Sequence, residues 1–297
     1  MNSVVQTAQQ GGKADKRPAL PFVLAAPAVF ALLVFLVLPV AVLIGESLTG
    51  PGGALEPYVK FLSSGYNQRV IWRTLQIAGA TTLLALALGL IVASALARIG
   101  GTLGQILLFL CVFPLLTSAL VRSFAWMVIL GRQGLVNTGL QGIGLIDAPL
   151  SLLFNPTAMV IVTPPAMVIG LVYLFTPLAI LTLKGAIEAI APQVREAATT
   201  LGATPIRLFT QVTLPLLVPS LIVSAVLIFT GSLAAFATAR LLGSERHMIL
   251  PTLLHEKVMV SFDWAAGSVI AAVMLVLSFA AITLFNALGR RANRMVD

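Results

Sequence analysis

The stretch REAATTLGATPIRLFTQVTLP, residues 195–215, is a polar interruption between two long apolar runs. It holds five threonines, two arginines and a glutamate, in a chain of 297 residues that is 59% hydrophobic and only 9% charged. A typical soluble domain carries about 25% charged residues, so this composition predicts an integral membrane protein. Which side of the membrane the polar stretch faces then depends on where the chain crosses the bilayer.

Six apolar runs are long enough to cross about 30 Å of hydrocarbon, which takes about 20 helical residues. Backbone polar groups in lipid need partners within their own segment, and these runs are apolar on every face. We therefore predict an all-α integral membrane protein with six transmembrane helices. The predicted spans cover residues 21–45, 71–97, 103–130, 158–183, 215–237 and 265–288. The first run is too long for a signal-peptide core and is predicted to be an anchor.

The basic residues favour a topology with both termini in the cytosol (N-in/C-in). In this topology ten of the 18 Lys and Arg residues lie on the cytosolic side, mostly in short segments and in the tails, where the positive-inside rule applies most strongly. We expect a disordered cytosolic tail at 1–19, one transmembrane permease domain at 20–290 and a second cytosolic tail at 291–297. Residues 190–214 then form a cytosolic loop, and the opening stretch faces water.

The sequence lacks the motifs of an ATPase, a metalloenzyme and a nucleic-acid-binding protein. There is no G-x-x-x-x-G-K-[ST] phosphate loop, and HEKVM at 255–259 lacks the second histidine of the zinc motif H-E-x-x-H. Two histidines and one cysteine, Cys111, offer no metal-binding cluster. The formal charge of +8 is spread over loops and tails. We therefore predict no catalytic residue, no metal, no cofactor and no nucleic-acid partner.

The polar loop predicts two short helices joined by a sharp turn. Pro192 suits the first turn of a helix, and apolar residues then recur at i, i+3, i+4 and i+7 from Val194 to Leu201. Gly202 can adopt the left-handed conformation that ends a helix. Thr204 and Pro205 are typical of the N-cap and first residue of a second helix, predicted to reach about Val212.

After this second helix, Leu214-Pro215 is predicted to restart the chain as the fifth span. Isolated helices as short as these two are marginal in water. We therefore expect the loop to be held by the rest of the membrane domain or by a docked partner.

The spacing in this loop resembles the EAA loop of membrane subunits of binding-protein-dependent ABC importers. Glu196-Ala197-Ala198, three residues, Gly202, nine residues and then Val212-x-Leu214-Pro215 follow that pattern. Val212 stands where isoleucine is usual, and Ala191 precedes Pro192 where aspartate is common. The resemblance extends from Arg73 to Leu288. RTLQIAGATTLLALALGLIVASALAR at 73–98 and FPLLTSALVRSFAWMVILGRQGLVN at 113–137 are similar to the spermidine/putrescine-type permease group.

This resemblance implies a type I ABC importer permease in a bacterial inner membrane. Its implied partners are a cytosolic ABC ATPase dimer, which binds the ATP, a periplasmic solute-binding protein, and a second homologous permease, in a heterodimer more readily than a homodimer. The EAA helices would lie in a groove of the ATPase. The residues assigned to ATPase coupling on this basis are Glu196, Ala197, Ala198, Gly202, Arg207, Leu214 and Pro215.

The transported solute is less well defined than the class of transporter. Several polyamine permeases carry Gly-Asp before the phenylalanine after the fifth span, whereas this chain has Ala234-Ala235-Phe236. Loss of that carboxylate removes a natural partner for a polycation. The resemblance thus implies a polyamine, or else a phosphonate, an opine or a related small polar molecule. Polar residues in spans flanking the loop are candidates for the pathway: Tyr173, Thr176, Thr230 and Ser232.

A self-sufficient secondary carrier or channel is the alternative, because six spans without an ATPase motif also suit that class. The absence of Asp or Glu near the middle of any predicted span weakens the case for a proton-coupled carrier. An intramembrane enzyme is not favoured, because no set of serine, histidine and carboxylate can be assembled within the spans. Arg122 is expected at the outer membrane interface beside Phe124 and Trp126, as a snorkelling side chain in an aromatic belt.

Overall fold

The regular elements of the chain are all helices in the part that the computed structural model describes, residues 19–49, 53–131, 133–147, 164–243 and 247–293. These residues fall into two compact units divided after Glu46. The first unit holds nearly all of α1 (Ala19–Ser47), an apolar helix that is long enough to cross a membrane. The second unit holds all other elements and the site described below.

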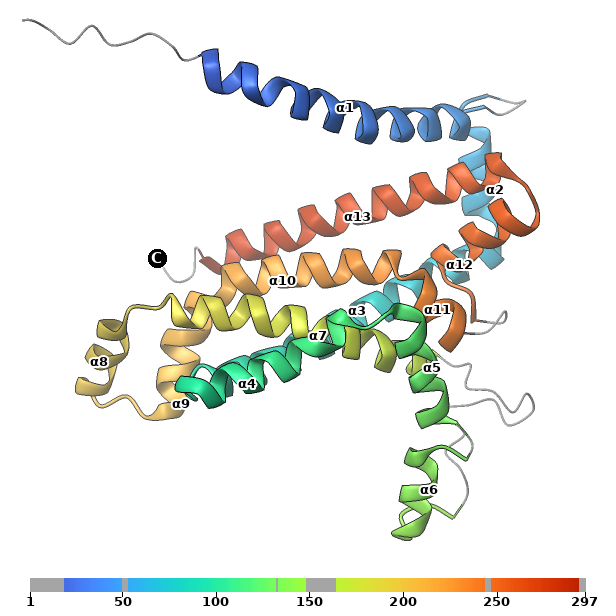
Figure 1. Ribbon diagram of the computed structural model, residues 1–297. Coiled ribbons are helices and arrows are strands. Elements are labelled where there is room, and N and C mark those ends of the chain that lie inside the picture. Colours follow the sequence, from blue (N-terminus) through green and yellow to red (C-terminus); the bar gives the residue numbers. More distant parts are fainter. Residues whose placement is uncertain (1–18, 50–52, 132, 148–163, 244–246, 294–297) are drawn as a thin grey trace, which may run out of the picture. The chain divides into compact units, whose positions relative to one another are not determined.

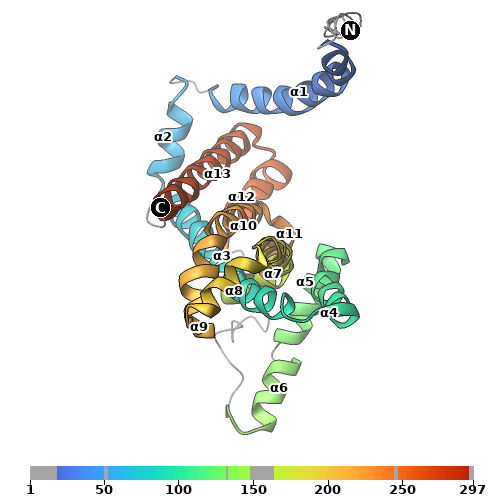
Figure 2. The ribbon, with the colours of Figure 1, turned by 90° about the vertical axis from the view of Figure 1, so that its left-hand side faces the viewer.

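Four long helices form the centre of the second unit: α3 (Gly65–Leu96), α7 (Pro164–Glu188), α10 (Leu214–Ala234) and α13 (Trp264–Asn293). α3 packs against α7 and α10, and α10 packs against α13 (Figure 1, Figure 2). The contact between α3, α7 and α10 buries small residues, among them Ala85, Ala93 and Ala179. Lipid gives no hydrophobic driving force for helix association, so the close packing that these small side chains allow contributes to holding the helices together.

Shorter helices lie at the two ends of this bundle. α11 (Phe236–Leu242), α12 (Leu250–His255) and the π-helical segment η4 (Glu256–Val260) lie at one end, beside α2 (Glu56–Ser63) (Figure 1). α8 (Pro192–Thr200) and α9 (Pro205–Arg207) lie at the other end. Thr74 fastens α12 to α3, because its buried hydroxyl accepts a hydrogen bond from the Leu250 N–H at 3.0 Å.

The third predicted span, residues 103–130, is interrupted and is therefore corrected to two helices. α4 (Gly101–Val112) continues as a short 3-10 helix, η1 (Phe113–Leu116), and α5 (Ala119–Leu130) begins after an extended Thr117. Pro114 favours a break here, because it has no N–H to donate and its ring clashes with the carbonyl four residues earlier, and the chain turns extended at Thr117 and Ser118. α6 (Leu135–Gly142) follows α5.

Six helical stretches of the described residues are long and apolar enough to cross a membrane: Ala26–Ser47, Gly65–Leu96, Ala119–Gly142, Pro164–Glu188, Pro205–Ala234 and Trp264–Arg291. The third of them runs through α5 and α6, whereas the apolar stretch Gly101–Leu116 is shorter. Residues 158–163 of the predicted fourth span lie outside the described residues, as does nearly all of the tail predicted at 1–19. The tail predicted from 291 begins inside α13.

Candidate coupling site and transport pathway

The turn predicted at Gly202 is present and closes α8. Gly202 has a φ of +81°, in the left-handed region that glycine adopts without strain. Its N–H donates to the Thr199 carbonyl at 2.9 Å, and the Ala203 N–H donates to the Ala198 carbonyl at 3.0 Å. These are the two hydrogen bonds of a Schellman motif, which satisfies carbonyls that the end of the helix leaves free. α8 therefore ends at a defined angle.

The second helix of the loop starts as predicted. The Thr204 hydroxyl accepts a hydrogen bond from the Arg207 N–H at 3.4 Å, and Pro205 follows as the first helical residue. Thr204 is thus the N-cap of α9.

The end of this second helix differs from the prediction, because α9 runs without a break into the fifth span. A π-helical segment, η2 (Leu208–Thr213), joins α9 to α10. Leu214-Pro215 therefore lies inside a continuous helix instead of restarting the chain. Pro215 lacks an N–H and its ring crowds the preceding turn, and the wider π turn in front of it gives the ring room.

The loop exposes apolar side chains beside a carboxylate. Leu201 is 88% exposed, Ile206 77% and Val194 40%. No residue of α8 is buried, and Glu196 is exposed with no partner for its carboxylate among the described residues. The other assigned residues of the loop are also at the surface, with Ala197 and Arg207 exposed and Ala198 partly buried. The Glu196 carboxylate and much of the apolar surface of Leu201 and Ile206 are therefore open to a partner.

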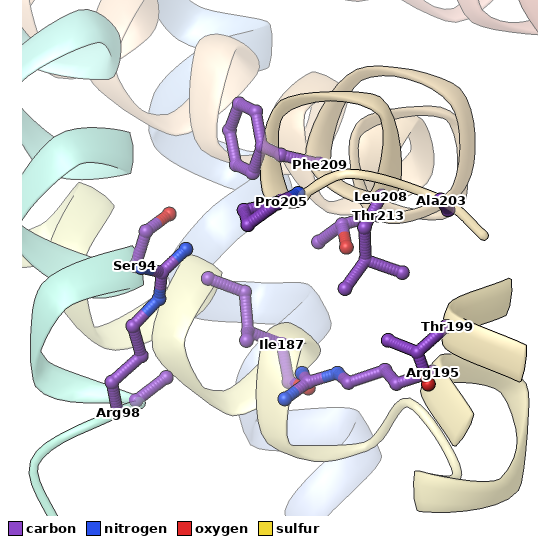
Figure 3. Close-up of a pocket in the computed structure, with 11 residues that line it drawn as sticks. Ser94, Arg98, Ile187, Arg195, Thr199, Ala203, Pro205, Leu208, Phe209 and Thr213 are labelled. Atoms are coloured by element: carbon purple, nitrogen blue, oxygen red, sulfur yellow. The ribbon is translucent and has the colours of Figure 1, made fainter.

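A hydrogen bond connects one side of α8 to the end of the membrane helix α7. Arg195 donates from Nη2 to the Ile187 carbonyl at the end of α7, at 2.8 Å (Figure 3). The last turn of α7 also carries an ion pair between Lys184 and Glu188. The Arg195 side chain therefore contacts α7, whereas the side chain of the neighbouring Glu196 is exposed.

Two of the four pathway candidates lie together. Tyr173 and Thr176 line an open cavity of about 720 Å³ between α3, α4, α5 and α7. The ring of Trp126 meets the ring of Tyr173 edge to face, with centroids 5.5 Å apart. The Thr176 hydroxyl donates to the Val172 carbonyl at 2.7 Å, so its oxygen can still accept a hydrogen bond. The remaining wall is almost entirely apolar.

The other two candidates, Thr230 and Ser232, are on α10 and do not line this cavity. The Thr230 hydroxyl donates to the Val226 carbonyl at 2.6 Å. Ser232 is buried, and its hydroxyl has no partner among the described residues. It lies just before the break at Ala235, after which the Phe236 ring stacks on His255 with centroids 4.7 Å apart.

Arg122 is buried, which corrects the prediction that it snorkels to the interface. Its side chain is 7% exposed, and Nη1 donates to the carbonyls of Pro114 at 3.0 Å and Thr117 at 3.3 Å. The break between η1 and α5 leaves the Thr117 carbonyl without a helical donor, and buried carbonyls need donors. The Pro114 carbonyl also accepts from the Thr117 hydroxyl at 2.8 Å, so Arg122 is a further donor to it. Pro114 was the available signal, since a proline in an apolar run predicts a break and hence carbonyls without helical partners.

Residues 85–294 match the family of binding-protein-dependent transport system inner membrane components, and the chain belongs to this family. It is a membrane-spanning permease subunit of an ABC importer in the inner membrane, and it is not an enzyme. The importer class predicted from the loop spacing is confirmed, and the self-sufficient carrier or channel is set aside. Transporters of this class also comprise ATPase and solute-binding components.

The chain is similar to the spermidine/putrescine transport system permease protein PotB of Haemophilus influenzae, with 32% identity over 243 residues and 82% of each chain covered. It is also similar to PotB of Escherichia coli, with 27% identity over 274 residues that cover 90% of this chain and 96% of the relative. Its fold matches a crystal structure of a bacterial ABC transporter involved in the import of the acidic polysaccharide alginate. That match has a TM-score of 0.77 at 20% identity, with 93% of this chain and 96% of the other covered.

Proposed function

We propose that the loop from α8 to η2 docks into a cytosolic ATPase dimer and passes its movement to the membrane helices. The observation that carries this proposal is the exposed apolar surface of Val194, Leu201 and Ile206 next to the unpaired carboxylate of Glu196. Burying such a surface against a partner is favourable by about 25 cal/mol per Å². Within the chain, α8 contributes to no hydrophobic core cluster of the described residues.

Each assigned residue has a role in this docking. Glu196 offers a charge to the ATPase, and Ala197 and Ala198 are small enough to let a partner surface approach closely. Gly202 fixes the angle between α8 and α9. The continuous helix through Leu214 and Pro215 carries displacement of the loop into the fifth span. The exposed Arg207 offers a second charged contact. The chain itself needs no cofactor, because the partner binds the ATP.

Two loop variants test the coupling. We expect Glu196→Arg and Gly202→Pro to reach the membrane in normal amounts yet to abolish ATP-driven uptake into vesicles, because they change the docking charge and the turn. Gln193→Ala, on the exposed surface of α8, is the matched control and should transport normally. Wild-type uptake by both loop variants would overturn the assignment.

The docking also requires that α8 faces the cytosol and therefore an N-in/C-in topology. In a Cys111→Ala background, single cysteines at Thr199, on α8, and at Ser261, before α13, lie at opposite ends of the bundle and are both exposed. A membrane-impermeant maleimide added to intact spheroplasts should label the cysteine at 261 and should label that at 199 only after permeabilisation. The reverse pattern would exclude the topology.

For the solute we propose a polyamine delivered by a periplasmic binding protein. The two similar PotB proteins support this choice, and the faces of Trp126 and Tyr173 can attract an ammonium group by cation–π interaction. A phosphonate or opine is the second candidate, because Ala234 and Ala235 offer no carboxylate to a polycation. Uptake of radiolabelled spermidine, competed separately by putrescine and by 2-aminoethylphosphonate, distinguishes the two.

A second homologous permease subunit is the remaining proposed partner, in a heterodimer in preference to a homodimer. Affinity purification of the tagged chain from its own membrane, followed by mass spectrometry, should yield one ATPase and one further permease. Recovery of this permease alone with the ATPase would indicate a homodimer instead.

A further inference from the structure

A second cavity, of about 390 Å³, lies behind α8 (Figure 3). Its lining comes from four places in the chain: the end of α3, the end of α7, α8 and the α9–η2 segment. It is separate from the cavity lined by Tyr173, since the two share no residue. The cavity therefore lies where the proposed coupling helix meets the ends of the membrane helices.

Two guanidinium groups from different segments enter this cavity. Arg98 follows the end of α3, and Arg195 belongs to α8 (Figure 3). No acidic side chain lines the cavity, and no described residue forms an ion pair with either arginine. Arg195 uses one N–H on the Ile187 carbonyl, which leaves most of its five donors available. The cavity therefore has the positive charge and the donors to hold an anion.

Ser94, near the end of α3, also lines the cavity. The Ser94 hydroxyl oxygen is buried and has no hydrogen-bond partner among the described residues. Buried hydroxyl groups nearly always have a partner, so Ser94 is an unsatisfied polar group in the wall of a cavity that is otherwise entered by two cationic side chains.

Most of the remaining lining is apolar, with Ala97, Leu208 and Phe209 among its members, and two threonines, Thr199 and Thr213, complete it. A cavity with a cationic rim and apolar walls, at the ends of membrane helices, suits a molecule with an anionic head and a hydrocarbon body. Basic pockets between transmembrane helices on the cytosolic side are typical binding sites for phospholipid headgroups. A small inorganic anion would leave the apolar walls unused.

We propose that this cavity binds the phosphate group of an anionic phospholipid from the cytosolic leaflet. The proposal rests on the proposed cytosolic position of α8. A phosphate held between Arg98 and Arg195 joins the end of α3 to the coupling helix. Bound anionic lipid thereby restrains α8 relative to the end of α3. The lipid composition of the membrane then regulates how much of the ATPase movement is transmitted from α8 to the membrane helices.

The test measures lipid bound to the assembled transporter, purified with its ATPase from nanodiscs that contain phosphatidylglycerol and phosphatidylcholine. Native mass spectrometry should show phosphatidylglycerol retained in preference to phosphatidylcholine. Arg98→Gln should weaken that retention about fivefold, as expected for one basic group near a membrane surface. Arg290→Gln, an exposed arginine in the last turn of α13, is the matched control and should retain the lipid normally.

Three results would overturn the proposal. Equal retention by Arg98→Gln and wild type would show that the cavity does not hold the lipid. Binding of inorganic phosphate in the absence of lipid retention would assign the cavity to a soluble phosphate. Retention of the lipid by the permease alone, but not by the assembled transporter, would indicate that an acidic side chain of the ATPase occupies the cavity in the complex.

Uptake assays separate a failure of this inference from a failure of the proposed function. Wild-type uptake should fall in vesicles without phosphatidylglycerol, and uptake by Arg98→Gln should fall less when that lipid is removed. Uptake that is independent of phosphatidylglycerol in both proteins contradicts the lipid site alone. No ATP-driven uptake by wild type in either membrane contradicts the proposed coupling instead.

Discussion

The contact between α3 and α7 at Gly89 leaves no room for a methyl group. A Cβ atom at residue 89 would lie 2.4 Å from the Cβ of Ala179 and 3.3 Å from its carbonyl carbon. Carbon atoms in contact are normally about 3.5–4.0 Å apart, so Gly89→Ala must push the helices apart by about 1 Å. The packed cluster along the same contact, which includes Ala85, Ala93 and Leu183, would loosen with it. Overpacking of this kind costs about 1–3 kcal/mol.

The free energy of unfolding of the purified protein in mixed micelles, followed by tryptophan fluorescence, measures this cost. Adding Ala179→Gly removes the closest atom and should restore most of the loss, because the remaining approach of 3.3 Å needs only a small shift. Gly79→Ala, on the same helix with nothing within 4 Å of its new Cβ, is the matched control and should not destabilise. Wild-type stability of Gly89→Ala, or no rescue by the second substitution, would refute the reasoning.

Three further substitutions have defined expectations. Arg122→Met leaves the Thr117 carbonyl without its side-chain donor and removes one of the donors to the Pro114 carbonyl, which the Thr117 hydroxyl still contacts at 2.8 Å. The change should cost about 1–3 kcal/mol in the same unfolding assay, with partial recovery in Arg122→Lys. Thr74→Val keeps the shape but leaves the buried Leu250 N–H unpaired, which should also cost about 1–3 kcal/mol, whereas Thr74→Ser should keep the hydrogen bond. Gly202→Ala places a side chain with a Cβ at φ +81°, which should destabilise the turn by about 1–2 kcal/mol. The turn should then open about 5–30 times more often, and trypsin should cleave the loop faster by the same factor. An unchanged cleavage rate would contradict a closed turn at Gly202.

Local signals in the sequence were sufficient for the coupling loop. Pro192, Gly202 and Thr204 each specify backbone geometry within a few residues, so the start of α8, its left-handed end and the N-cap of α9 were all predictable. The continuity of α9 with α10 was not, because proline at 215 suggested a new start. The π segment that accommodates it has no simple sequence signature.

The sequence of the apolar spans predicts where the membrane helices are, but it says little about which helices pack together. A run that is apolar on every face shows no periodicity, so it does not reveal which side faces a neighbouring helix. For this reason the four polar pathway candidates could not be ranked, and only Tyr173 and Thr176 share a cavity. The burial of Arg122 likewise depends on the break between η1 and α5, and the apolar composition of this region does not reveal that break.

The continuous helical stretch from Pro205 to Ala234 contains 30 residues, and moving as one body it would form a lever about 45 Å long. A tilt of only about 5° at the Gly202 end would move the far end by about 4 Å, at a rise of 1.5 Å per residue. That far end is the break at Ala235, beside the stacked Phe236 and His255. Under the proposed coupling, a small closure of an ATPase would thus become a larger displacement at the opposite face of the membrane, carried by tilting of the stretch as one body.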